Sequence, residues 1–180
     1  VEAVQRLAGE AGMALPAEHG LVAPGAAGYP YERVNNVPYD PHEARRLLAE
    51  AGYPKGQGFP TVVMQINNDG FGYVPVAEAV QEMLGAELGV GVTVSVLPST
   101  KHYERIESGR SPLWRGGWIA DHPDPENFLA VLDGRNADWP DGGPSTVNTT
   151  RYANARFDSL FRQAGLIVDR TERSRLLAEA

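Results

Sequence analysis

Aromatic and charged side chains gather within one short stretch of the sequence. It contains Trp114, Arg115, Trp118 and Asp121, with the pair Gly116-Gly117 in its middle. The paired glycines let another group approach the backbone closely. An apolar wall with one or two placed charges is the composition of a small-molecule site. The stretch therefore predicts a binding site, with the alternative that both tryptophans are only core or edge residues.

Metal-ligating residue types cluster directly after this stretch. The run Asp121-His122-Pro123-Asp124 is followed closely by Glu126. These carboxylates and the imidazole of His122 could hold a divalent ion and support a metal-assisted hydrolase. However, the two prolines around Asp124 restrict which side chains converge, and an Asp before Pro is typical of a helix N-cap. We therefore expect no metal site, and the hydrolase is kept as an alternative.

Other catalytic and cofactor motifs are missing from the sequence. It has no cysteine, so thiolate metal sites and cysteine nucleophiles are excluded. It also has no P-loop and no Gly-x-Ser-x-Gly elbow. None of the histidines is paired at zinc-site spacing, so we expect all four at the surface or in turns: His19, His42, His102 and His122. We expect a protein that is not an enzyme and needs no cofactor.

Composition excludes several classes of partner. The 180 residues carry 16 Lys and Arg against 23 Asp and Glu, a formal net charge of −7. This acidic balance argues against nucleic-acid binding and against polybasic membrane attachment. No apolar run approaches the roughly 20 residues of a membrane span. With 42% hydrophobic residues, 20 Gly and 14 Pro, the chain can form a real core with many turns between short elements.

The order of predicted elements indicates an α/β fold. Asp40 and Pro41 predict a helix over residues 41–51, closed by Gly52. Two β-branched runs, at 61–66 and 90–97, flank a helical pattern that includes Leu84, which makes a βαβ unit with parallel strands. The apolar side chains of the first helix are expected to form a packing stripe: Ala44, Leu47, Leu48 and Ala51. We expect a mixed βαβ sheet flanked by helices.

The rest of the chain predicts further helices around a third strand. The expected elements are a helix over 1–11, a helix over 99–107, a third strand over 111–119, a helix over 124–132, a long loop over 133–150, a helix with apolar positions from 157 to 168, and a last helix opened by the capping box at 169–172. Residues 1–38 predict an irregular lead-in segment. Neither terminal helix has its outer cap, so we expect a piece of a longer chain.

The segment from Gly117 to Phe128 closely resembles a known family signature. It reads GWIADHPDPENF and is similar to the signature of the family 5 extracellular solute-binding proteins, the oligopeptide-, dipeptide- and nickel-binding components of ABC importers. The resemblance continues through 39–54 and the βαβ unit, and through Asn148, Tyr152 and Asn154. It implies one lobe of a two-lobed fold of the periplasmic-binding-protein type II, with 39–180 as the ligand-binding lobe.

The resemblance also implies roles for three residues. Asp121 matches the carboxylate that receives the α-ammonium group of a peptide ligand. Trp118 matches the tryptophan packed beside that site. Arg115 matches a basic position that can meet a carboxylate. His122-Pro123 departs from the family, where a tyrosine or asparagine and a polar residue are often seen, whereas Asp124 and Asn127 are expected to be a helix cap and a packing contact.

The implied function is capture of peptides, or a related small solute, in a cleft between two lobes, and delivery to a membrane permease. The implied partners are the ligand, the permease and the first lobe of the same protein, which is not in this chain. The implied location is periplasmic or extracellular, with lipid anchoring left open. One alternative is a receptor for a non-peptide ligand such as a nickel chelate, a sugar or an opine. Another is a purely structural module, in which Asp121 and Trp118 would be inaccessible.

Overall fold

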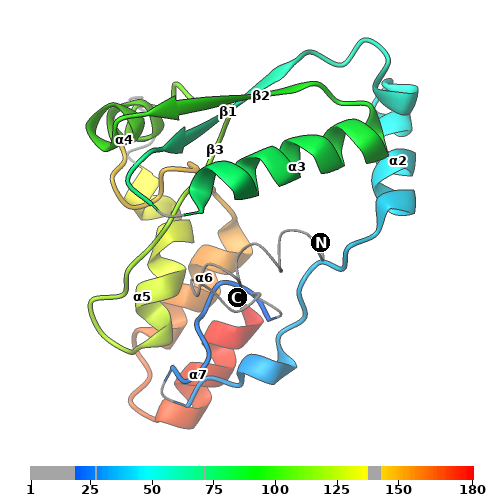
Figure 1. The fold of residues 1–180 in the computed structure, drawn as a ribbon. Helices are drawn as coiled ribbons and strands as arrows, with labels where there is room; N and C mark the ends of the chain where they lie inside the picture. The colour runs from blue at the N-terminus through cyan, green and yellow to red at the C-terminus, as the bar shows by residue number, and fades with distance from the viewer. Residues whose placement is uncertain (1–18, 27, 71, 138–142) are drawn as a thin grey trace. The chain divides into compact units, whose positions relative to one another are not determined.

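The structure is a computed structural model that describes residues 19–26, 28–70, 72–137 and 143–180 (Figure 1). The chain divides into two compact units. Among the described residues, the first unit contains 37–105 and 110–116, and the second contains 19–36, 106–109 and 117–180. The helix predicted over 1–11 lies outside the described residues.

A three-stranded parallel sheet organises the first unit. Its strands are β1 (Val62–Asn67), β2 (Val92–Leu97) and β3 (Leu113–Trp114), in the order β2-β1-β3. The register pairs Val62 with Val92 and Met64 with Leu113, and both pairs of strands are parallel. Helix α3 (Tyr73–Leu88) connects β1 to β2 (Figure 1). The predicted βαβ unit is confirmed.

The central strand β1 is buried on both faces along its second half. Met64 and Ile66 point into an apolar cluster with Ala77 of α3, while the alternate residues Gln65 and Asn67 are also buried. Alternate strand residues face opposite sides of a sheet, so the polar pair lies on the face away from this cluster. Burial on both faces is expected for the middle strand of a parallel sheet.

Helix α2 (Pro41–Glu50) begins and ends as its sequence predicts. The Asp40 carboxylate accepts hydrogen bonds from the backbone amides of His42 and Glu43. At the other end Gly52 adopts a φ of 93°, a left-handed conformation that suits glycine. The predicted packing stripe is wrong for Leu47, which is 51% exposed, whereas Leu48 packs against the core. A short 3₁₀ helix over Pro54–Gly56 follows.

The predicted third strand is much shorter than expected. Only Leu113–Trp114 pair with β1, followed by one more hydrogen bond from the Arg115 amide to the Gln65 carbonyl. The chain then passes through Gly116 and Gly117 from the first unit to the second. Glycine gives a strand no side chain to pack. Ile119, which the long strand would include, is 93% exposed.

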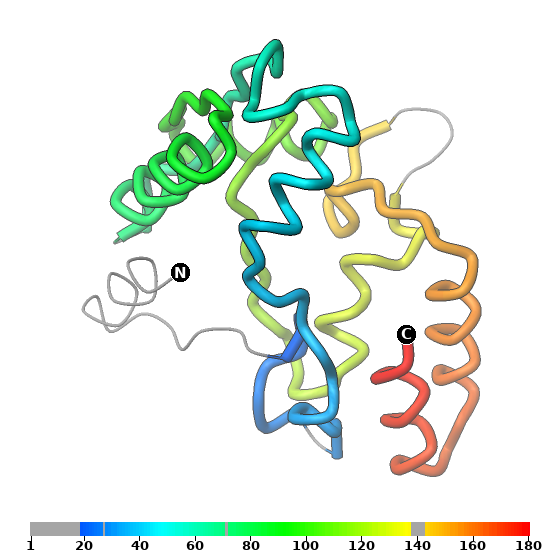
Figure 2. The backbone as a smooth tube through the Cα atoms, turned by 90° about the vertical axis from the view of Figure 1, so that its right-hand side faces the viewer, coloured from blue at the N-terminus to red at the C-terminus, as the bar shows by residue number. Residues whose placement is uncertain are grey.

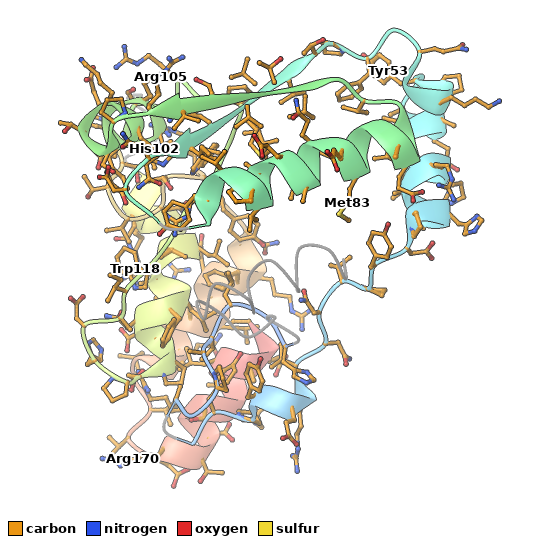
Figure 3. All side chains as sticks on the ribbon, viewed as in Figure 1. Tyr53, Met83, His102, Arg105, Trp118 and Arg170 are labelled. Carbon is orange, nitrogen blue, oxygen red and sulfur yellow. The ribbon has the colours of Figure 1, made fainter. Side chains whose placement is uncertain are left out.

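His102 is buried, which contradicts its predicted surface position. It lies in helix α4 (Ser99–Glu107) and is 1% exposed (Figure 3). Its Nδ1 lies 3.0 Å from Gln65 Nε2, and its Nε2 lies 3.0 Å from the Arg115 carbonyl oxygen. A carbonyl only accepts, so Nε2 carries the proton, and Nδ1 accepts from the Gln65 amide. Ser111 Oγ donates to Gln65 Oε1 and completes the network.

Acid is expected to destabilise the chain through His102. Burial lowers the pKa of His102 from its ordinary value of 6.5; the hydrogen bond to the Arg115 carbonyl opposes this, and the Arg115 charge adds to it. Below about pH 6.5 the unfolded chain therefore binds a proton that the folded chain resists, so stability falls with pH by up to about 1.4 kcal/mol per unit. Urea unfolding at pH 7.0 and 5.5 measures this effect.

Two variants control the acid experiment. His102→Gln is expected to lose most of the pH dependence, whereas His42→Gln, a change at an exposed histidine, is expected to keep it. An equal pH dependence in His102→Gln and the unchanged chain would contradict the assignment to His102.

The regular elements described in the second unit are helices. They are α5 (Pro125–Leu129), α6 (Ala155–Ala164) and α7 (Arg170–Glu179), with 3₁₀ helices at Tyr31–Arg33, Ala130–Leu132 and Gly134–Ala137. Helices α6 and α7 pack side by side (Figures 1 and 2). The helix predicted from 124 to 132 therefore forms, but its last turn is 3₁₀. Asn154 and Asp169 cap α6 and α7 with their side chains.

The core of the second unit joins its early and late segments. Phe157 and Phe161 of α6 stack 5.7 Å apart, and Val22 of the lead-in segment packs into the same cluster. The helix predicted to reach 168 ends earlier, because Val168 lies beyond α6 and is 95% exposed. Within the part of the chain that the structure describes, no helix has the length and apolar character needed to cross a membrane.

Candidate functional site

The predicted site residues Trp118 and Asp121 lie on the segment that leads into α5. The segment has no regular secondary structure over 115–120. Both side chains are exposed, Trp118 by 40%. Figure 3 labels Trp118. The chain then enters α5 at Asp124, whose carboxylate caps the helix by accepting from the Glu126 amide at 2.9 Å. The interpretation of Asp124 as a cap is confirmed.

Asn127, in the first turn of α5, joins Trp118 to Asp121. Its Oδ1 accepts from the Trp118 indole Nε1 at 2.9 Å and from the Asp121 backbone amide at 3.3 Å. Its Nδ2 lies 3.5 Å from Asp121 Oδ2 and 3.4 Å from His122 Nδ1. The expectation that Asn127 is only a packing contact is wrong, since its amide touches both predicted binding residues.

Arg173 of α7 fixes the start of α5. Its guanidinium holds both oxygens of Asp124, at 2.8 and 3.0 Å, and also contacts Glu126. Partial burial raises the pKa of Asp124, but the hydrogen bonds from Arg173 and from the Glu126 amide outweigh it and hold the pKa below its ordinary value. A bidentate pair of this kind is geometrically specific. The helix that carries Asn127 is thus anchored on a second helix.

Asp121 lines a pocket of about 350 Å³ within the second unit. One wall is the loop at residues 23–26, and the opposite wall is formed by residues 120–123 together with Phe128. Apart from Asp121 and His122 the lining side chains are apolar. A concave, mostly apolar surface with one carboxylate can bind a small cationic group and pack its attached carbon chain.

Arg115 lies in the other compact unit, at the carboxyl end of β3. Its guanidinium stacks over the Tyr73 ring at 3.7 Å and donates to Asn67 Oδ1 at 3.4 Å. Asn67 ends β1, so the three residues share the edge of a parallel sheet at which ligands of open α/β folds bind. None of the described hydrogen bonds links Arg115 to Asp121. The binding role of Arg115 stays a prediction.

The metal-site alternative finds no geometric basis. Within residues 19–26, 28–70, 72–137 and 143–180, no group of three or more histidine or carboxylate side chains could hold a metal ion. The carboxylates of Asp124 and Glu126 are instead held by Arg173.

The fold resembles that of solved periplasmic binding proteins. A solved periplasmic oligopeptide-binding protein from Borrelia burgdorferi superposes with a TM-score of 0.80 over 98% of this chain and 33% of its own, at 23% identity. The chain belongs to the bacterial extracellular solute-binding proteins, family 5, because the model of that family's Middle region matches residues 6–147. The resemblance drawn from the sequence, and the α/β fold it implied, are confirmed.

Curated relatives carry several ligand names. Heme-binding protein A of Haemophilus influenzae is 29% identical over 83% of this chain and 26% of its own length. Di/tripeptide-binding protein 3 of Pseudomonas aeruginosa is 28% identical over 83% of this chain and 27% of its own length. The chain thus spans about a quarter of the length of each of these relatives. Both relatives are named as binding proteins, and neither as an enzyme.

Sequence reasoning missed Asn127 and Arg173 as parts of this site. Asn127 is part of the family signature. Its contacts with Trp118 and Asp121 form only because a turn brings residue 127 back over residues 118–121. Arg173 lies 49 positions from Asp124, and no sequence pattern signals that pairing. The one available signal was the cluster of Asp121, Asp124 and Glu126, which has no Lys or Arg within it.

Proposed function

We propose that this chain is part of the substrate-binding component of an ABC importer and binds peptides through their free α-ammonium group. The observation that carries the proposal is the Asp121 carboxylate, which lines an apolar pocket beside the exposed Trp118. Peptide-binding relatives of the same family support the ligand class.

Asp121 differs from the nearby Asp124 and Asp133 in what surrounds it. The carboxylates of Asp124 and Asp133 are held by Arg173 and Arg135. Among the described residues no Lys or Arg forms an ion pair with Asp121, whose carboxylate contacts only the Asn127 amide. A desolvated ammonium group needs a charged acceptor, and charge-assisted hydrogen bonds are about twice as strong as neutral ones. Asp121 is therefore suited to receive a cationic group from a ligand.

The complete receptor, in this proposal, has a second lobe that closes over the same ligand. Support comes from the curated relatives, of which this chain spans only a part. Hinge closure of two lobes around a solute is the established behaviour of such folds. The receptor would work outside the cytoplasmic membrane, with or without a lipid anchor, and deliver its ligand to a membrane permease. It would perform no covalent chemistry.

Blocking the ligand's amino terminus is expected to abolish most of its affinity. In the complete receptor, N-acetylation of di-, tri- and tetra-alanine should weaken binding at least about tenfold, because acetylation removes the charge that Asp121 would accept. Isothermal titration calorimetry of each free peptide and its acetylated form measures the difference.

Methyl esters of the same peptides serve as the control, because they keep the ammonium group and lose only the carboxylate charge. Equal affinity for free and acetylated peptides would contradict the role of the ammonium group. Failure of every alanine peptide to bind, together with tight binding of a heme or another non-peptide solute, would overturn the ligand class.

A further inference from the structure

We propose that Asn127 is a positioning residue that sets the Trp118 ring and the Asp121 carboxylate in their ligand-binding arrangement before a ligand arrives. The inference rests on the proposed function, because it assigns a role within the same site. It concerns the contacts that hold the site residues in place. The description of the family and the names of the relatives say nothing about these contacts.

The hydrogen-bonding groups around Asn127 determine which way its amide faces. An indole Nε1 is a donor only, so the Asn127 atom that faces Trp118 at 2.9 Å must be the oxygen. The same oxygen accepts from the Asp121 backbone amide. The NH₂ group therefore faces the Asp121 carboxylate, which is an acceptor only when ionised. A flipped amide would put donor against donor and acceptor against acceptor.

This arrangement occupies one oxygen of the carboxylate and leaves the other for a ligand. The Asn127 amide approaches Oδ2 of Asp121. Among the described residues no hydrogen bond reaches Oδ1 of Asp121, so that atom can accept from an ammonium group. The contact with Oδ2, together with the bond to the Asp121 backbone amide, restrains the side chain without neutralising its charge.

Asn127 can hold this position because its helix is itself anchored. The Asp124 cap and the Arg173 guanidinium fix the first turn of α5, which places residue 127 above the 118–121 segment. The 118–121 segment has no regular secondary structure and exposed side chains. Its order therefore depends on contacts such as the two that Asn127 makes with Asp121 and the one with Trp118.

Prior ordering of the site raises affinity because fewer side chains must be immobilised on binding. Removing the Asn127 amide frees two of them, Trp118 and Asp121. Asn127→Leu, which keeps the approximate volume, is expected to weaken binding of di-, tri- and tetra-alanine by about 5- to 50-fold. The loss should fall mainly on the ammonium interaction, so binding of the N-acetylated peptides should weaken by a smaller factor than binding of the free peptides.

A double-mutant cycle separates positioning from general stability. In an Asp121→Ala background, Asn127→Leu should cause a smaller loss than in the unchanged receptor, because only the Trp118 ring is then left to position. Gln163→Leu replaces an exposed amide of α6 and should leave binding unchanged. The Trp118 indole resonance, assigned with Trp118→Phe in ¹⁵N-labelled protein, should shift in Asn127→Leu, while the melting temperature stays within a few degrees of the unchanged receptor.

The outcomes distinguish this inference from the proposed function. If the unchanged receptor and Asp121→Ala behave as expected but Asn127→Leu binds like the unchanged receptor, only the inference is overturned. An equal loss in the Asp121→Ala background, or for acetylated peptides, would also overturn it, because Asn127 would then act only on the fold. If the unchanged receptor binds no alanine peptide, the proposed function fails, and the inference fails with it.

Discussion

Asp121→Ala is expected to weaken binding of alanine peptides to the complete receptor by about 10- to 1,000-fold. The range follows from about 1.5–3 kcal/mol for a hydrogen bond to a charged group, rising when the partner charge is left desolvated, at about 1.4 kcal/mol per tenfold change. The other described residues that line the pocket include no second carboxylate, so none of them can replace the charge of Asp121. Calorimetric titration measures the loss.

The contrast with two other variants makes the Asp121 experiment specific. Asp121→Asn keeps the shape and one acceptor, so its loss should be smaller than that of Asp121→Ala. Glu78→Gln removes an exposed carboxylate from α3 and should not change affinity by more than about twofold. Binding by Asp121→Ala within twofold of the unchanged receptor would exclude Asp121 as the ammonium acceptor.

Ile66→Ala is expected to cost about 2–5 kcal/mol of the free energy of unfolding. Ile66 is 1% exposed in the middle of the sheet and packs in the cluster with Met64 and Ala77. The loss combines the transfer of buried methyl and methylene groups with the cavity they leave. Urea unfolding followed by far-UV circular dichroism measures the change.

Two further variants keep this prediction testable if Ile66→Ala fails to fold. Ile66→Val should cost only about 0.5–1.5 kcal/mol. Val63→Ala, on the same strand but 42% exposed, should cost clearly less than Ile66→Ala. A loss at Val63 as large as the loss at Ile66 would show that the central strand is not packed as described.

The fold could be predicted where the signals are local. Asp40 before Pro41 marks the start of α2, and the β-branched runs mark β1 and β2, because caps and strand propensity act over a few residues. The third strand was predicted too long, because 111–119 was interpreted as one strand interrupted by two glycines, although the chain leaves the sheet at Gly116. The point at which a strand stops pairing with the adjacent strand is set by tertiary structure.

Buried polar residues were the main failure of sequence reasoning in the fold. His102 was expected at the surface, yet its two ring nitrogens meet Gln65 and the Arg115 carbonyl. Gln65 lies in β1 and Arg115 directly follows β3, and no spacing rule connects them. A single histidine on an α-helix gives no indication of whether such partners exist.

The site was predicted in part. Asp121 and Trp118 follow from the signature around them, and both are exposed beside the first turn of α5. The amide that joins them, Asn127, required the turn geometry, and the anchor of that turn, Arg173, comes from a helix far along the chain. Positioning residues act through space, so sequence order does not reveal them.

The most direct test of peptide capture is native mass spectrometry of the complete receptor purified from its expression host, beside Asp121→Ala. Closure of a receptor around a ligand can trap it through purification. We predict that denaturation releases a heterogeneous set of small peptides with free amino termini from the unchanged receptor and none from Asp121→Ala. A single non-peptide mass, retained equally by both proteins, would contradict the account.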